Sequence, residues 1–378
     1  MSGAAQERSG PGSSLALDYT PAAGHAPGAG RYVRELVRAL VRLPAPSISR
    51  LRLVEVGRAP RPMAGAALGL SGPSVLRSVE HRCLRVPRRA VHLASRLPLG
   101  LGRWIGGGCD LFHRTHPGWP PASTRLQSLA VAEFPVAGSL EAERLAAAAE
   151  GADGLLVFSA DAARRLQRDY GAPAHRIHQV PVGTDHWDRD LTDAPEPRPT
   201  RDVLVLGAIR RSRRPLAALR AFEALRARGS RSRLLLVGRP GDAALELREA
   251  LRASPAANHV RWIEGPEEGR MPRCVAGAAV LLHLTDGEAT PVTPLEAARH
   301  GLGVVASAVP AFEEALGAAA RFVDADDPSA VGAALEEVLQ QTEDPDIREG
   351  WIRIASPYTW RASAGAHLSA WETILQGH

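Results

Sequence analysis

The sequence predicts an α/β protein of two domains, each built on a parallel β-sheet with helices on both faces. Its 378 residues are long for one domain and suit two, each able to bury a core. Apolar runs of four to seven residues alternate with helical patterns, as in strands buried on both faces. A segment rich in Pro and Asp, residues 187–200, separates the two halves and is predicted to be a linker.

The predicted strands are short apolar runs bounded by turn residues. In the first half they cover residues 14–18, 51–56, 110–112, 126–131, 153–159 and 177–180, with helices over 31–40 and 160–170. In the second half they cover residues 202–207, 233–238, 260–263, 278–284, 303–306 and 321–323. Ligands of such sheets bind at the carboxyl ends of the strands, which is where candidate site residues are sought.

Composition excludes several classes of protein. The chain is 45% hydrophobic and 23% charged, which is ordinary for a globular protein. No apolar run approaches the roughly 18 residues that span a bilayer, and no signal-peptide pattern opens the chain. Cys83, Cys109 and Cys274 form no paired framework and show no metal-ligand spacing. We therefore expect a cytoplasmic protein.

Positive charge is concentrated in the first hundred residues. All 46 basic residues are arginines, and residues 1–100 hold fifteen of them against five acidic residues, a balance of +10. No nucleic-acid-binding module is recognisable. The charge fits peripheral contact with the inner face of the cell membrane or an anionic acceptor, and compositional bias is an equal alternative. The basic and apolar stretch 74–102 is either a membrane-facing surface or, as we prefer, a solvated helix packed on the core.

Two glutamates mark the candidate site. Glu288 and Glu296 follow the predicted strand 278–284, the first in a loop and the second about a turn into a helix that begins near 291–293. Backbone N–H groups at a helix amino terminus face an anion, and carboxylates accept hydrogen bonds from hydroxyls. This arrangement is suited to holding a sugar attached to a phosphate.

The stretch 260–327 resembles the donor-binding half of family 4 glycosyltransferases, which are retaining enzymes with the GT-B fold. Their E-x7-E signature, usually EGFGxPxLE, corresponds here to Glu288–Glu296. Ala289, Thr290 and Pro291 replace the usual Gly, Phe and Gly, and Pro291 cannot donate a backbone N–H. The hydroxyl of Thr293 compensates, as in the EAFGLT form of sucrose-type members.

Other stretches extend this resemblance over nearly the whole chain. The loop glycines Gly28 and Gly30, followed by residues 31–40, are similar to the GIGRYVRELVRAL opening of mannosyltransferases. Without the resemblance, a tight strand–helix turn explains them equally well. Residues 153–185 resemble the end of the family's first domain. Tyr358-Thr359-Trp360 resembles the YSW where the last helix crosses back to that domain.

The resemblance implies a diphosphate site in the arginine-rich loop after residue 207. Arg213 aligns with the family's lysine, and Arg210 supplies a second charge because Ala208 stands where the family has arginine. A solvated basic loop is the alternative. Glu264 and Gly265 follow the strand where the family's backbone contacts a nucleobase.

One departure concerns catalysis. Family members carry a His-Asp pair near the anomeric carbon, and this chain has Ala132 and Glu133 there. His113 and His116, one loop earlier, are the candidates to reach the cleft instead, and loop histidines without a role are the alternative.

The resemblance implies a GT-B fold: two Rossmann-like domains facing each other across a cleft, with the C-terminal helix crossing back to the first domain. The predicted parts are a disordered N-terminus (1–13), an acceptor domain (14–186), the linker (187–200), a donor domain (201–356) and the C-terminal helix (357–378).

The implied function is retaining transfer of a hexose from a nucleotide-diphosphate sugar of the GDP or UDP type to a glycan, lipid-linked or small-molecule acceptor. The opening motif around Gly28 and Gly30 favours mannose as the transferred sugar. Arg210 and Arg213 would stabilise the departing diphosphate, Glu296 would hold the ribose and Glu288 would orient the sugar, with no metal or further cofactor. The alternative is a catalytically degenerate relative that binds a nucleotide sugar or a partner enzyme, and a nucleotide-sugar epimerase ranks third.

Overall fold

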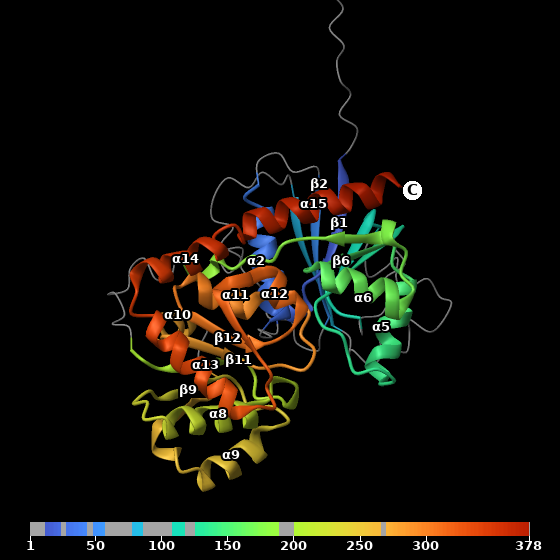
Figure 1. Cartoon of the computed structure of the whole chain (residues 1–378). Coiled ribbons are helices and arrows are strands. Elements are labelled where there is room, and N and C mark those ends of the chain that lie inside the picture. Colours follow the sequence, from blue (N-terminus) through green and yellow to red (C-terminus); the bar gives the residue numbers. More distant parts are fainter. Residues whose placement is uncertain are drawn as a thin grey trace, which may run out of the picture.

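Two parallel β-sheets organise the protein, as the computed structural model shows (Figure 1). The structure describes residues 12–23, 28–43, 48–56, 78–85, 108–117, 125–188, 200–265 and 270–377. The first sheet has seven strands in the order β3-β2-β1-β4-β5-β6-β7, and the second has six in the order β10-β9-β8-β11-β12-β13. The predicted α/β class and parallel sheets are confirmed.

The strands of the first sheet are β1 (Ser13–Asp18), β2 (Ile48–Val56), β3 (Ser78–Leu84), β4 (Leu111–Arg114), β5 (Leu126–Val131), β6 (Gly154–Val157) and β7 (Ile177–Gln179). Those of the second sheet are β8 (Val203–Leu206), β9 (Leu234–Val237), β10 (Val260–Ile263), β11 (Val280–His283), β12 (Gly303–Ser307) and β13 (Ala320–Val323).

The helices include α1 (Thr20–Ala23), α2 (Ala29–Leu40), α5 (Leu140–Glu150), α6 (Ala160–Tyr170), α8 (Pro215–Ala227), α9 (Ala244–Ala253) and α10 (Met271–Ala276). They continue with α11 (Val292–Arg299), α12 (Pro310–Leu316), α13 (Pro328–Gln341), α14 (Pro345–Ala355) and α15 (Trp360–Gln376). Within the described ranges, no helix is long and apolar enough to cross a membrane.

Strand β3 corrects one prediction. We preferred a solvated helix for residues 74–102, but residues 78–84 pair in parallel with β2 at the edge of the first sheet. Arg52 on β2 donates to Glu80 on β3 at 2.7 Å, and Val79 packs on the core. Pairing with β2, and not a helix, therefore accounts for these residues. Most of the rest of that stretch lies outside the described residues, as do residues 1–11 of the predicted disordered N-terminus and 189–199 of the linker.

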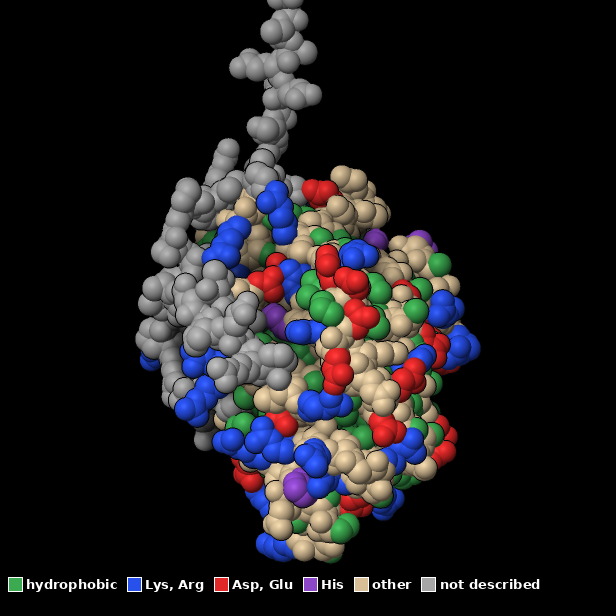
Figure 2. Space-filling model, turned by 60° about the vertical axis from the view of Figure 1, so that its left-hand side comes forward, with side chains coloured by type: hydrophobic (Ala, Val, Ile, Leu, Met, Phe, Trp, Pro, Cys, Tyr) green, Lys and Arg blue, Asp and Glu red, His purple; other side chains and the backbone are tan. Residues whose placement is uncertain are grey.

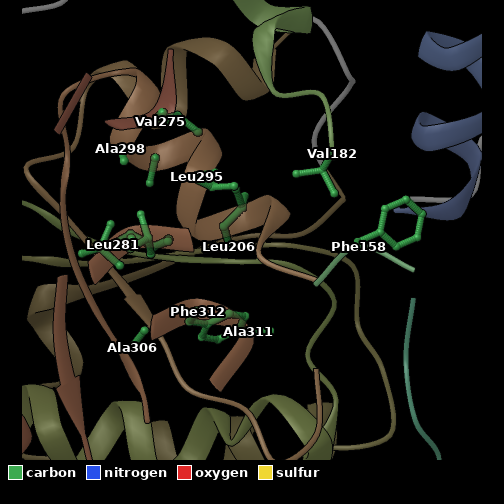
Figure 3. Close-up of a cluster of buried hydrophobic side chains, with 14 of the residues drawn as sticks. Phe158, Val182, Leu206, Val275, Leu281, Leu295, Ala298, Ala306, Ala311 and Phe312 are labelled. Atoms are coloured by element: carbon green, nitrogen blue, oxygen red, sulfur yellow. The ribbon is translucent and has the colours of Figure 1, made fainter. Parts of the chain in front are cut away.

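One continuous hydrophobic cluster joins the two domains. It includes Phe158 and Val182 of the first domain and Leu206 and Leu295 of the second, all buried (Figure 3). Burial of apolar surface stabilises packing by about 25 cal/mol per Å². The carboxyl ends of the two sheets are therefore held against each other in this arrangement.

Helix α15 returns to the first domain, where it packs on α2, β5 and β6 (Figure 1). Gly154 on β6 and Gly183 make this possible. A Cβ atom on Gly154 would collide with Ile374, and one on Gly183 would collide with Trp360. Asp185 also accepts a hydrogen bond from the backbone N–H of Trp360 at 2.7 Å. The predicted crossing of the C-terminal helix is confirmed.

Candidate functional site

Three side chains meet at the carboxyl edge of the second sheet. His283 ends β11, the following loop brings Glu288 back over it, and Arg213 comes from the turn after the neighbouring strand β8. Arg213 Nη2 donates to Glu288 Oε1 at 3.0 Å, and His283 Nε2 lies 2.6 Å from Glu288 Oε2. That nitrogen carries the proton, because an ionised carboxylate only accepts. The backbone N–H of Asp286 donates to the Ser212 carbonyl at 3.0 Å and fixes the two loops together.

The electrostatics of this group keep Glu288 ionised. Burial acts to raise the pKa of the Glu288 carboxyl, but the charges and hydrogen bonds of His283 and Arg213 outweigh it and hold the pKa below its ordinary value. This contact does not use all the N–H donors of Arg213. Its Nη1 is buried and has no hydrogen-bond partner within the described residues, so it can donate to a phosphate oxygen.

Backbone geometry directs this arginine. Arg214, which follows it, has φ +45° and is the one non-glycine residue with positive φ in the described part of the chain. The left-handed conformation costs a side-chain-bearing residue about 1–2 kcal/mol. It turns the chain from the β8 loop directly into α8, where Pro215 is accommodated because the first helical turn needs no N–H donor.

The second glutamate lies between the domains. Glu296 on α11 is 1% exposed, and its Oε1 accepts from Arg31 Nη1 of α2 at 2.9 Å. His186 Nε2 is 3.4 Å from the same oxygen. Burial raises the pKa of the Glu296 carboxyl above its ordinary value, although Arg31 opposes the shift. The other oxygen, Oε2, is buried without a hydrogen-bond partner in the described ranges and can accept from a hydroxyl.

The glycine loop positions Arg31. Gly28 has φ +72° immediately before α2, a conformation that glycine adopts without strain. A Cβ atom on Gly30 would lie 2.6 Å from the Pro21 carbonyl oxygen. These glycines are therefore required by the turn itself, and through it they bring Arg31 to Glu296.

The loop between the glutamates is fastened to the first domain. Thr290 Oγ1 donates to the Ala132 carbonyl at 2.7 Å, and Ser159 Oγ donates to the Ala289 carbonyl at 3.1 Å. The backbones of Glu133 and Glu288 form an antiparallel bridge. The positions that replace the expected His-Asp pair thus meet this loop through main-chain groups.

One predicted cleft residue, His113, lies inside the first domain. His113 is fully buried inside the first domain, where Nδ1 lies 2.9 Å from Ser128 Oγ and Nε2 lies 3.2 Å from Tyr32 Oη. Burial, assisted by the nearby His367, holds the pKa of His113 well below its ordinary value. It therefore does not line the cleft. His116 follows in an exposed loop.

The remaining predicted donor residues are dispersed along the edge of the second sheet. Arg210 is exposed. Glu264 is exposed and pairs with Arg248 at 2.5 Å, beyond the edge strand β10. Gly265 has φ +58°, and Thr293 is half-buried in the first turn of α11. Among the described residues, none of these four forms a hydrogen bond or ion pair with Glu288.

Three partners of the glutamates were missed by sequence reasoning: His283, Arg31 and His186. His283 carried a usable signal, because it is the last residue of a buried strand and precedes Glu288 by five positions. Arg31 follows the glycine loop directly, but its partner is 265 positions away along the chain. No spacing rule connects two such residues.

Many other arginines are paired with carboxylates on the surface. Figure 2 shows basic and acidic side chains interspersed over one face of the protein. The pairs include Arg211 with Glu246 at 2.6 Å and Arg233 with Asp202 at 2.7 Å. A cavity of ≈ 330 Å³ beside Arg211 is lined by charges of both signs. These paired surface arginines fit the arginine-rich composition, and Arg213 differs from them because its side chain is only 25% exposed and contacts the largely buried Glu288.

Comparisons with known proteins agree with this fold. Residues 200–341 match the family model of glycosyl transferases group 1. No curated protein matches the sequence. The structure resembles the sucrose-phosphate synthase of Thermosynechococcus elongatus with a TM-score of 0.73, 16% identity and coverage of 97% of this chain and 100% of that one.

Two further solved structures are similar. WaaG, a glycosyltransferase involved in lipopolysaccharide biosynthesis, matches with a TM-score of 0.65, 15% identity and coverage of 94% of this chain and 98% of that one. A glycosyltransferase from Rickettsia africae matches with a TM-score of 0.67, 13% identity and coverage of 97% and 100%. The predicted GT-B fold and the glycosyltransferase resemblance are confirmed, and assignment to family 4 stays a prediction.

Proposed function

We propose that this protein, whose second domain matches glycosyl transferases group 1, transfers a hexose from a nucleotide-diphosphate sugar to an acceptor with retention of configuration. The observation that carries the proposal is a pair of buried, unsatisfied polar atoms beside the two glutamates. Arg213 Nη1 is a donor without an acceptor, and Glu296 Oε2 is an acceptor without a donor, among the described residues. A diphosphate and a ribose hydroxyl would satisfy one each.

The proposed chemistry needs little beyond positioning and charge. The bond between the anomeric carbon and the phosphate oxygen breaks, and a bond from that carbon to the acceptor oxygen forms on the same face of the sugar. The acceptor's proton passes to the departing phosphate, so no histidine is required as base. Arg213 stabilises the charge that develops on the diphosphate, and Glu288, held by Arg213 and His283, orients the sugar hydroxyls.

Donor and acceptor are proposed from the sequence motifs. The residues around Gly28 and Gly30 favour a mannosyl donor, hence GDP-mannose, with UDP-sugars next. The acceptor would bind to the first domain as a glycan or a lipid-linked molecule. The +10 balance of residues 1–100 favours a peripheral hold on anionic membrane, which should weaken with salt because exposed charges are screened over roughly 8–10 Å.

A specific observation favours the alternative, a relative that binds without turnover. The space expected for a sugar between the domains is crossed by the contacts of Thr290 with Ala132 and of Ser159 with Ala289. If these contacts are permanent, a donor would bind without reaching an acceptor. If they belong to a closed unliganded arrangement, they would part when the donor enters.

Thermal stabilisation by a panel of UDP-, GDP- and ADP-sugars tests the proposal first. A ligand at 100 times its dissociation constant adds about 2.7 kcal/mol to the free energy of unfolding. Glu296→Ala should weaken binding of the bare nucleotide, and Glu288→Ala should weaken only the contribution of the sugar. Equal loss of bare-nucleotide affinity in both variants would contradict these roles.

Turnover then separates enzyme from binder. Each stabilising donor is offered with lipid-linked and soluble acceptors, and both glycosylated product and hydrolysed donor are measured. Arg210→Gln is the matched control for Arg213→Gln, because Arg210 is exposed in the same loop. Tight donor binding with no product and no hydrolysis for any acceptor would establish the non-catalytic alternative.

A further inference from the structure

A second cluster of chemically reactive side chains lies at the outer edge of the first sheet. Glu55 is on β2, and His81 and Cys83 are on the edge strand β3. The parallel register places Glu55 directly beside Cys83. Because side chains two positions apart on a strand share a face, His81 points to the same side as Cys83 and Glu55. The three side chains therefore converge near the carboxyl ends of both strands.

Their donor atoms form a compact triangle. His81 Nε2 is 3.1 Å from Glu55 Oε2, Cys83 Sγ is 3.5 Å from Glu55 Oε2, and Cys83 Sγ is 3.5 Å from His81 Nε2. A tetrahedral Zn²⁺ ion with bonds of about 2.0 Å to nitrogen and oxygen and about 2.3 Å to sulfur separates its ligands by about 3.3 Å for N–O and about 3.5 Å for pairs with sulfur. The observed triangle agrees with these edges within about 0.2 Å.

Hydrogen bonds from His81 and from the Cys83 thiol to the same Glu55 oxygen account for two sides of the triangle, but not for the third side, between sulfur and imidazole. A thiol has one proton, yet Cys83 Sγ is equally distant from the carboxylate and the imidazole. Thiolate, imidazole and carboxylate are together the ligand types that Zn²⁺ prefers. Their combination on one face of two adjacent strands matches a metal better than an accidental polar contact.

The surroundings favour a bound cation as well. Glu55 is buried, and His81 and Cys83 are half-buried. Bulk water therefore has only partial access to the three side chains and competes weakly with them for a bound ion. The ring of Tyr19 packs edge-on against His81, with centroids 6.2 Å apart. The Tyr19 hydroxyl is buried and makes no hydrogen bond within the described residues. A water on the metal would give this hydroxyl a partner that the protein itself does not supply.

We propose that Glu55, His81 and Cys83 bind Zn²⁺ and leave its fourth position to water. The ion fastens the edge strand β3 to β2 at the rim of the first domain. This site is separate from the one proposed for glycosyl transfer, and its test does not depend on that activity. The cysteine spacing did not reveal it, because one ligand comes from a neighbouring strand and the other two are only two positions apart.

Metal titration of the full chain tests the site. The protein is prepared without a histidine tag, stripped with a chelator and titrated with Zn²⁺ against a chromophoric chelator. Co²⁺ serves as the spectroscopic probe. We expect one equivalent of Zn²⁺, and a thiolate-to-cobalt charge-transfer band. Cys83→Ser should remove the band and weaken Zn²⁺ binding about 100-fold or more, because the ligand itself is lost.

Two variants control this experiment. Cys109→Ser removes a buried cysteine whose sulfur contacts Arg52 instead of the cluster, and it should retain both the band and the affinity. Glu55→Gln should keep the thiolate band while weakening Zn²⁺ binding about 10–100-fold. Far-UV circular dichroism and the melting temperature of each stripped variant verify that it folds.

The melting temperature also provides an independent reading. Zn²⁺ should raise the melting temperature of the wild type and of Cys109→Ser, because an ion that binds the folded state stabilises that state. It should not raise the melting temperature of Cys83→Ser. If the stripped Cys83→Ser variant fails to fold, Glu55→Gln takes its place, and its Zn²⁺ affinity and melting temperature are compared with those of the wild type. The proposal is overturned if the wild type binds no stoichiometric Zn²⁺. It is equally overturned if Cys83→Ser, or Glu55→Gln in its place, binds as the wild type does.

Discussion

The two glutamates of the signature lie eight positions apart and have opposite environments. Glu288 is held by Arg213 and His283 of its own domain, with its side chain 12% exposed and its pKa below the ordinary value. Glu296 is 1% exposed, is held by Arg31 of the other domain and has a raised pKa. The first site is complete within the second domain, whereas the second depends on how the domains pack. On the proposed function, we therefore expect Glu288 to be preorganised for the reaction, and we expect the contacts of Glu296 to depend on the packing of the two domains.

The largest effect should follow from changing the preorganised glutamate. Glu288→Gln keeps the shape of the side chain but removes the charge that Arg213 and His283 surround. We expect kcat to fall about 10²–10³-fold, the usual effect of losing one electrostatic contact in a transition state. Steady-state kinetics measure this, and Glu264→Gln is the control, because Glu264 is exposed and pairs with Arg248 elsewhere. A similar fall for both variants would remove Glu288 from its proposed role.

A smaller effect should follow from changing the planar group of Arg213. Arg213→Lys keeps the charge but cannot place one nitrogen on Glu288 and another on a phosphate. Losing one charged hydrogen bond should weaken donor binding about 10–100-fold. Calorimetric titration with the nucleotide sugar measures the affinity. Arg210→Lys, in the same loop and exposed, should leave it unchanged. An unchanged affinity in Arg213→Lys would place the diphosphate elsewhere.

The opposite pKa shifts predict opposite dependences of stability on pH. The lowered pKa of Glu288 contributes stability above its unfolded value of 4.5, and this is lost as pH falls through the folded pKa. The raised pKa of Glu296 contributes stability that is full below 4.5 and is lost as pH rises through the folded pKa. Urea unfolding of Glu288→Gln, Glu296→Gln and wild type from about pH 3 to about pH 8 measures both.

Relative to wild type, Glu288→Gln should be less stable near neutral pH and should approach it in acid. Glu296→Gln should gain on the wild type as pH rises above 4.5. The two differences should have opposite signs, as the two pKa shifts do. Parallel pH profiles for the two variants would show that the environments are not opposite.

Much of the fold could be predicted because its physical causes are local. Strand β10 has the predicted bounds, since an apolar run between polar turns has few alternatives. Helix α6 also has the predicted bounds, because Ser159 caps its first turn and Gly171 ends it with φ +64°. Strand β3 was missed because Glu80, His81 and Arg82 interrupt its apolar residues, and the arginines of the surrounding stretch 74–102 resembled a basic surface helix.

The site was predictable only where the chain places residues at strand ends. Glu288 and Arg213 meet because each follows the carboxyl end of one of two adjacent strands, the edge at which site residues were sought. The partner Arg31 could not be predicted, because it depends on the packing of two domains. His113 was predicted to reach the cleft because it lies one loop before Ala132, and a position in the sequence does not reveal whether a side chain is buried. The structure shows it hydrogen-bonded inside the first domain.

The smallest effect concerns the contact that closes the loop over the first domain. Thr290→Val keeps the shape of the side chain and removes the hydrogen bond to the Ala132 carbonyl. Ala132 is exposed, so water replaces the lost donor, and we expect the free energy of unfolding to fall by only about 0.5–1 kcal/mol. Thr293→Val is the matched control, because the Thr293 hydroxyl makes no hydrogen bond to another described residue, and its loss should not change the free energy of unfolding.

The same substitution distinguishes a closed enzyme from a permanent binder. If the loop leaves Ala132 when a donor enters, weakening the contact by about 0.5–1 kcal/mol should strengthen donor binding about 2–5-fold, because less free energy is needed to open. The side-chain contacts of Glu288 should survive this opening, since Arg213 and His283 belong to the same domain, whereas its backbone bridge to Glu133 should part. Calorimetric titration of Thr290→Val with the donor measures the gain. Donor affinity equal to that of the wild type, together with the expected loss of stability, would show that the contact persists when the donor is bound.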